Sequence, residues 1–173
     1  GRDEVTPGHI TDLFTDAAMA ATAEARQPYF LWLAYNAPHT PWLADDKYRA
    51  PYLGIPNERL APPLHPGGGK PFDWATYYAV ITHLDEAVGR LVSTLKARGQ
   101  WDNTVLFFVG DNGYVPGTRG WVGKVRHWEE SVRIPYFACG GAVKARAQVD
   151  DPVASIDAVP TWLDLAGLKP ARP

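Results

Sequence analysis

The sequence predicts an α/β protein in which helices cover a mostly parallel sheet. Three short apolar runs have the length and composition of buried strands, and they alternate with amphipathic segments of helical period. Strands buried on both faces, combined with amphipathic helices, are typical of a parallel sheet enclosed by helices. The 173 residues are 46% hydrophobic and 21% charged, which is enough for one domain with a real core.

The first predicted element is a helix over 11–25, with Thr11 or Asp12 as the capping residue. Its apolar face is expected to consist of Leu13, Phe14, Ala17, Ala18, Ala21 and Ala25. The dipeptide Gln-Pro at 27–28 ends this helix. The aromatic-rich run 29–35 then predicts a strand that is buried on both of its faces.

Residues 36–72 show no regular period and contain eight of the sixteen prolines. A stretch this long without periodicity is either a functional loop, which would shape a binding pocket, or a plain surface excursion. The sequence leaves both interpretations open.

The clearest helix is predicted over 73–98, with Asp73 as its cap and Gly99 as its end. Its apolar stripe is Tyr77, Ile81, Leu84, Val88, Leu91 and Leu95. Two further buried strands are predicted over 105–109 and 134–138. A short helix from Asp157 to Ala166 follows them.

Ligands of parallel α/β sheets bind at the carboxyl ends of the strands, where Asp111 and Asn112 follow the run 105–109. A carboxylate and an amide oxygen side by side are hard donors that suit calcium or magnesium. Asn112-Gly113 is also a favoured tight-turn dipeptide, so the residues alone leave a simple turn as the alternative.

Two further candidates carry the chemistry of anion binding. His39 lies between two prolines just after the run 29–35, where a stiff loop can aim an imidazole at an anion or at a proton. Lys124 follows Gly123 in a glycine-containing loop and supplies a compact positive charge. The alternative for His39 is an ordinary surface histidine. The alternative for Lys124 is a solvated loop whose positive charge is offset by Glu129 and Glu130.

The charge balance excludes some partners. Seventeen basic and nineteen acidic residues give a net charge of −2, which provides no whole-surface attraction for nucleic acid or an anionic membrane. No apolar run approaches the roughly 20 residues that span a bilayer. We therefore expect no nucleic-acid partner and no membrane segment.

Five segments, in this order, resemble the sulfatase family. Residues 28–41 resemble the segment that ends in the family's active-site histidine, and 78–91 resemble its long helix. Residues 102–113 are similar to its metal-binding strand end, and 123–135 to the segment with its sulfate-binding lysine. Residues 156–167 resemble the helix that follows.

The resemblance implies an incomplete alkaline-phosphatase-like α/β/α sandwich and the activity of an arylsulfatase-like sulfuric ester hydrolase. The family uses a formylglycine nucleophile beside a calcium ion. Asp111 and Asn112 would be calcium ligands, and His39 and Lys124 would bind sulfate and assist catalysis. The substrate would be a small-molecule or glycan sulfate ester, and the family favours a periplasmic or secreted location.

The formylglycine signature, Cys or Ser followed two residues later by Pro or Ala and four residues later by Arg, is absent. Cys139 and the serines at 93, 131 and 155 all fail it. We therefore expect residues 1–173 to be one partial catalytic domain, without its nucleophile segment and C-terminal subdomain, and inactive in isolation. A phosphonate or phosphodiester hydrolase of the same superfamily, or a catalytically inactive sulfate- or glycan-binding module, are the alternatives.

Overall fold

The computed structural model describes residues 6–61, 72–141, 143–145 and 147–169. The chain divides into two compact units. The first contains residues 1–102 and 116–123, and the second contains residues 103–115 and 124–173.

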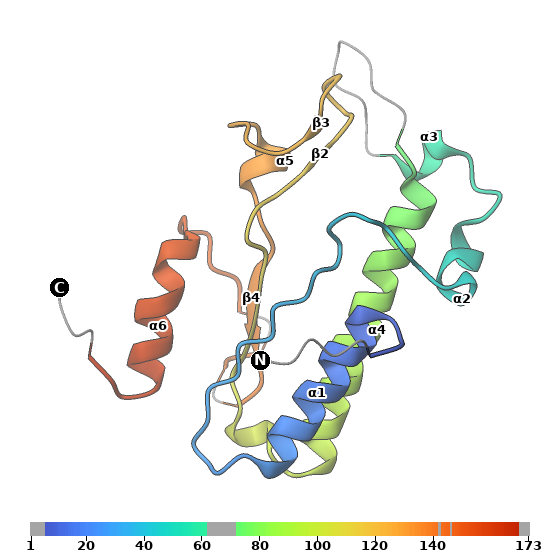
Figure 1. Cartoon of the computed structure of the whole chain (residues 1–173). Helices are drawn as coiled ribbons and strands as arrows, with labels where there is room; N and C mark the ends of the chain where they lie inside the picture. Colours follow the sequence, from blue (N-terminus) through green and yellow to red (C-terminus); the bar gives the residue numbers. More distant parts are fainter. Residues whose placement is uncertain (1–5, 62–71, 142, 146, 170–173) are drawn as a thin grey trace. The chain divides into compact units, whose positions relative to one another are not determined.

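Two long helices, α1 (Ile10–Glu24) and α4 (Trp74–Ala97), lie side by side in the first unit (Figure 1). The predicted helix over 73–98 is confirmed, because the Asp73 carboxylate caps α4 by accepting a 3.0 Å hydrogen bond from the Thr76 amide. Gly99 follows at a φ of +67°, the left-handed conformation that ends many helices. The core between the helices consists of Ala18, Leu91 and Leu95, with Met19, Leu33 and Trp101 packed against it.

The buried face of α1 differs from the predicted one. Phe14 is exposed, whereas Thr11, Thr15 and Thr22 are buried together with Ala18. The hydroxyls of Thr15 and Thr22 donate to the carbonyls four residues earlier, over 2.7 Å and 2.9 Å. These polar groups are therefore satisfied within the helix and can be buried without an unpaired hydroxyl.

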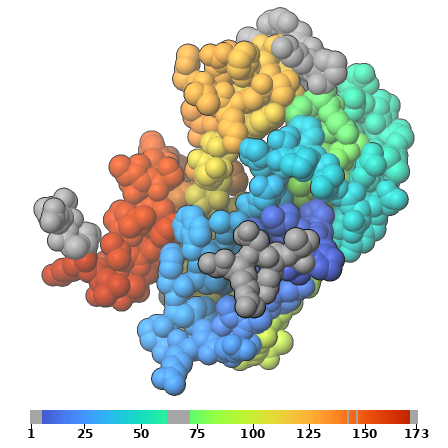
Figure 2. All heavy atoms as spheres, in the orientation of Figure 1, coloured from blue at the N-terminus to red at the C-terminus, as the bar shows by residue number. Residues whose placement is uncertain are grey.

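Three single-turn helices occupy the region that shows no period in the sequence: α2 (Asp46–Arg49), η1 (Ala50–Tyr52) and α3 (Asn57–Leu60). They pack against α4, and Figure 2 shows this teal segment directly against the green part of the long helix. The Tyr78 hydroxyl donates to the Leu60 carbonyl over 2.8 Å, and the hydroxyls of Tyr52 and Thr82 lie 2.7 Å apart. Residues 62–71 of the predicted loop lie outside the described residues.

The prediction of a buried strand over 29–35 is wrong for this structure. The segment is extended but belongs to no strand, and the side chains of Phe30 and Trp32 are 69% and 66% exposed. A strand that is buried on both faces needs neighbouring strands and covering helices, and the exposure of these rings shows that this condition is not met here.

The strands predicted over 105–109 and 134–138 form in the second unit as β1 (Leu106–Val109) and β4 (Tyr136–Cys139). Their expected burial is wrong, because their residues are only half-buried and Phe137 is 52% exposed. The two strands run antiparallel, with Leu106 opposite Cys139 and Val109 opposite Tyr136, so this pair does not follow the expected parallel arrangement. Parallel neighbours need a long crossover, usually a helix. The helix assigned between β1 and β4 is α5 (Glu129–Val132), which is only one turn long.

The predicted C-terminal helix is confirmed as α6 (Ala158–Leu165), which continues from the short helix η3 (Ser155–Asp157). The ring of Trp162 on α6 lies edge-on to Phe107 of β1, with centroids 6.1 Å apart. Two shorter strands, β2 (Val115–Pro116) and β3 (Val122–Gly123), form a second sheet, and η2 (Trp101–Asn103) precedes β1. In the part of the chain that the structure describes, no helix has the length and apolarity of a membrane span.

Candidate functional site

The turn after β1 is fixed at both ends by backbone hydrogen bonds. The amide of Gly110 donates to the carbonyl of Pro135 over 3.0 Å, and the amide of Gly113 donates to the carbonyl of Ser131 over 2.9 Å. A Cβ atom at position 113 would lie 2.3 Å from the carbonyl oxygen of Glu130. Gly113 is not among the residues with positive φ, so the site needs glycine here because another backbone passes close by.

This turn presents Asp111 and Asn112 to solvent. One carboxylate oxygen of Asp111 accepts from the amide of Asn112 over 2.8 Å. The side-chain Nδ2 of Asn112 donates to the carbonyl of Gly113 over 2.7 Å, which fixes the orientation of the side-chain amide. The Oδ1 atom of Asn112 lies 3.4 Å from Nζ of Lys124. The structure therefore brings together three of the four predicted site residues.

A cavity of about 300 Å³ adjoins these residues. Asp111 and Asn112 form its polar side, and Ser131, Val132, Ile134 and residues 153–155 complete it. The two side chains are exposed oxygen donors, a donor set that fits calcium or magnesium. They can fill two of the six to eight positions that calcium prefers.

The backbone around Lys124 is unusual. Gly123 has a φ of +136° and Val125 a φ of +65°. A β-branched residue in the left-handed region is a conformational outlier, and the side chain of Val125 is 91% exposed, so it gains little from packing. The loop that carries Lys124 is therefore held in a conformation that its own sequence disfavours.

His39 belongs to the first unit. Its amide donates to the carbonyl of Asn36 over 2.8 Å, and its Nδ1 lies 2.7 Å from the carbonyl oxygen of Thr40. Because a carbonyl can only accept, Nδ1 carries the proton and Nε2 of the neutral ring keeps its lone pair. The exposed His39 also lines a cavity of about 330 Å³ together with His9 and Leu43. Its convergence with Lys124 stays a prediction.

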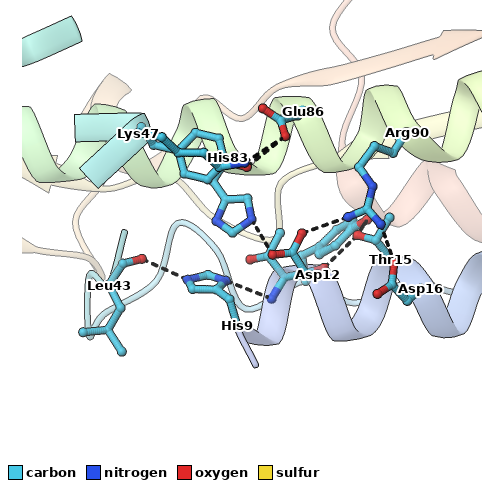
Figure 3. A network of polar contacts seen from close by, with 12 residues as sticks. His9, Asp12, Thr15, Asp16, Leu43, Lys47, His83, Glu86 and Arg90 are labelled. Atoms are coloured by element: carbon cyan, nitrogen blue, oxygen red, sulfur yellow. Dashed lines mark hydrogen bonds and ion pairs between the residues drawn. The ribbon is translucent and has the colours of Figure 1, made fainter. Parts of the chain in front are cut away.

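The first unit contains a polar network that was not predicted from the sequence (Figure 3). The carboxylate of Asp12 on α1 accepts from Nη1 of Arg90 over 2.9 Å and lies 3.1 Å from Nε2 of His83, both on α4. Arg90 also donates to Asp16. Asp12 and Asp16 are one helical turn apart, and His83 and Arg90 are two turns apart. This spacing, which places each pair on one face of its helix, was the signal available in the sequence.

The chain matches the family model described as Sulfatase over residues 2–168. Among curated proteins, it is 29% identical to the uncharacterized sulfatase YdeN of Escherichia coli (strain K12) over 93% of this chain and 28% of that protein. It is also 29% identical to a choline-sulfatase of Rhizobium meliloti (strain 1021), over 84% of this chain and 33% of that protein. The chain thus spans about a third of the length of these relatives.

Solved structures share the fold. The protein yidJ from Bacteroides fragilis superposes with a TM-score of 0.83 at 29% identity, over 95% of this chain and 38% of that chain. BT4656, solved in complex with its substrate D-glucosamine-2-N,6-O-disulfate, gives the same TM-score at 19% identity, over 98% of this chain and 51% of that chain, a likeness of fold alone. These matches support the predicted α/β fold of the alkaline-phosphatase type.

Proposed function

Because the chain belongs to the sulfatase family, we propose that the protein hydrolyses sulfate esters and that Asp111, Asn112 and Lys124 form part of its anion and metal site. The observation that carries the proposal is the approach of Nζ of Lys124 to Oδ1 of Asn112, 3.4 Å, beside the exposed carboxylate of Asp111. A cationic group next to two oxygen donors is the arrangement needed to hold an anion against a divalent metal ion.

In this proposal, Asp111 and Asn112 are two of the ligands of a calcium ion. When bound, the ion supplies positive charge that polarises the sulfate group. Lys124 donates hydrogen bonds to the non-bridging sulfate oxygens, which gain charge as the ester bond breaks. The hydrogen bonds that fix the turn 110–113 keep the two oxygen ligands, Asp111 and Asn112, in place without the protein having to reorganise.

His39 is proposed as the second sulfate-binding and catalytic residue. The hydrogen bond from its Nδ1 to Thr40 fixes the ring and leaves Nε2 available on the exposed side chain. A protonated Nε2 donates to the oxygen of the leaving alcohol and can transfer its proton there. The location of this residue in a stiff proline-flanked loop supports a positioned acid rather than a freely rotating surface histidine.

The nucleophile is proposed to be a formylglycine outside these 173 residues, because no Cys or Ser in the chain has the required signature. The hydrated aldehyde of formylglycine supplies the attacking hydroxyl. We further propose that residues 1–173 are one part of a larger catalytic domain. The chain alone should therefore lack sulfatase activity, since it contains site residues without the attacking group.

The substrate is proposed to be a small-molecule or glycan sulfate ester. Named relatives support this class, among them a choline-sulfatase and a human N-acetylglucosamine-6-sulfatase that is 27% identical over 161 residues. The name of an extracellular sulfatase homologue from Drosophila melanogaster likewise supports a location outside the cytoplasm.

The proposal is tested in the full-length protein with an aryl sulfate and a matched aryl phosphate diester. Lys124→Met keeps the length of the side chain and removes its charge, and Lys144→Met makes the same change at an exposed lysine outside the site. Loss of one donor to developing charge typically costs about 10²–10³ in kcat, so Lys124→Met should lose that much and Lys144→Met should lose nothing. Equal turnover by both variants would contradict the proposed role of Lys124. Preference for the phosphate diester would assign the protein to the phosphodiester hydrolases instead.

A further inference from the structure

We propose that His9, Asp12 and His83 form a second metal site in the first unit, specific for a divalent transition metal ion such as zinc. One donor atom from each residue lies within 4.8 Å of the other two. Two imidazoles and one carboxylate are the donor set of zinc and related ions rather than of calcium or magnesium. His9 lines the same cavity as His39. The inference is still separate from the proposed sulfatase activity, because none of its three residues is among the proposed catalytic and calcium-binding residues.

His9 is oriented as a ligand. Its Nε2 lies 3.0 Å from the carbonyl oxygen of Leu43, so Nε2 carries the proton and Nδ1 keeps its lone pair. Metal-bound histidines typically donate their second ring N–H to a carbonyl or carboxylate in this way. The present partner of Nδ1 is the amide of Thr11, at a long 3.3 Å, and a metal ion can compete with this contact.

Asp12 is held by an outer partner. Nη1 of Arg90 donates to one carboxylate oxygen over 2.9 Å, while the other oxygen, Oδ2, lies 3.1 Å from Nε2 of His83 (Figure 3). Arg90 also donates to Asp16, so the guanidinium is held against α1 by two carboxylates. Arg90 therefore fixes the Asp12 carboxylate through Oδ1, and Oδ2 faces the imidazole of His83.

His83 is the buried member, with only 1% of its surface exposed. Its ring stacks on Tyr48 at a centroid distance of 4.2 Å and lies 4.3 Å from the ring of His9, so its position is fixed. Its Nδ1 is buried without a hydrogen-bond partner among the described residues. Nε2 carries the ring proton, because its partner Asp12 can only accept. A metal ion bound at Nε2 would replace this hydrogen bond, and the ring proton would move to Nδ1.

The cavity beside His9 gives an ion access to the edge of the proposed site. This cavity of about 330 Å³ is lined by His9, Thr11 and Val80, so it reaches one of the three proposed ligands. Zinc bonds of about 2.0–2.1 Å place tetrahedral ligands roughly 3.4 Å apart. His9 precedes the first turn of α1 and is only half-buried, so it is the ligand that can move inward.

The experiment uses the purified full-length protein after treatment with a chelator. Zinc is titrated calorimetrically, bound metal is counted by mass spectrometry, and cobalt is added as a spectroscopic probe of tetrahedral coordination. We expect one zinc ion per chain and a visible cobalt spectrum. His9→Asn retains an acceptor for the amide of Thr11 and removes the imidazole. Because a direct ligand is lost, the affinity should fall by at least about 100-fold, which is the upper end of what loss of an outer partner alone costs.

Two control variants separate this site from others. His127→Asn removes an exposed histidine of the second unit, and Asp111→Asn alters the proposed calcium site, so both should bind zinc as the parent chain does. Failure of the folded parent chain to take up zinc would overturn the inference. The same holds if His9→Asn binds zinc unchanged or if His127→Asn loses the ion. Each of these results leaves the sulfatase proposal standing, because activity is measured separately.

Discussion

Gly113 provides the sharpest test of how the candidate site is built. In Gly113→Ala, the new Cβ would lie 2.3 Å from the carbonyl oxygen of Glu130 and 3.0 Å from two carbonyl carbons. The nearest obstacles are all backbone atoms, which cannot rotate away. The turn and the start of α5 must therefore separate by about 1 Å to restore an ordinary contact, the kind of overpacking that costs about 1–3 kcal/mol.

The same movement stretches the 2.9 Å hydrogen bond from the amide of Gly113 to Ser131. A hydrogen bond contributes about 1 kcal/mol, so we expect Gly113→Ala to lower the free energy of unfolding of the second unit by about 2–4 kcal/mol. Urea denaturation followed by tryptophan fluorescence measures the loss. Amide exchange in β1 and β4 then shows whether the second unit is the part that opens.

Gly89→Ala is the matched control. Gly89 lies inside α4, and a Cβ there meets nothing within 4 Å. Alanine is the better helix former, so this variant should be more stable than the parent by about 0.5–1 kcal/mol. If Gly113→Ala unfolds within about 0.5 kcal/mol of the parent, the close approach at Gly113 does not restrict the turn, and the reasoning is wrong.

Three further predictions concern stability. Leu91→Ala should cost about 2–5 kcal/mol in thermal or chemical unfolding, because Leu91 is buried in the core beside Ala18 and Leu95, whereas Leu53→Ala at an exposed site should cost little. Val125→Gly should be as stable as the parent or up to about 1 kcal/mol more stable, since it relieves the left-handed backbone at φ +65°; a clear destabilisation would mean that the valine side chain contributes packing. Asp73→Ala should cost about 1 kcal/mol at neutral pH. The hydrogen bonds from Thr76 lower the pKa of the Asp73 carboxyl in the folded state. This stabilisation is therefore complete above the ordinary aspartate pKa near 4 and is lost as the pH falls through the lowered value, so the two proteins should converge in acid-unfolding curves.

Local patterns predicted the elements whose structure is decided locally. The period of α4, its cap at Asp73 and its end at Gly99 are confirmed, as are the positions of β1 and β4. The face of α1 was mispredicted, because threonines that bond back to their own helix behave as buried residues. The pattern of polar and apolar residues in the sequence does not show which threonine hydroxyls bond to their own helix.

Tertiary contacts decided the rest. The pairing of Asp12 with His83 joins residues 71 positions apart, and the requirement for glycine at 113 arises from the backbone of Glu130. Neither relationship has a local signal in the chain. Lys124 approaches Asn112, but the roles of these residues and of Asp111, and the place of His39 relative to them, stay predictions.

The extended segment 29–35 affects how readily the chain aggregates. Its seven residues include no charge and no proline, and they present the rings of Phe30 and Trp32 largely to solvent. Uncharged, exposed segments of high β-propensity are the ones that associate into intermolecular sheets. The concentration at which the 173-residue chain remains dispersed should therefore be set by this segment, and a single lysine in place of Trp32 should raise that concentration in light-scattering measurements.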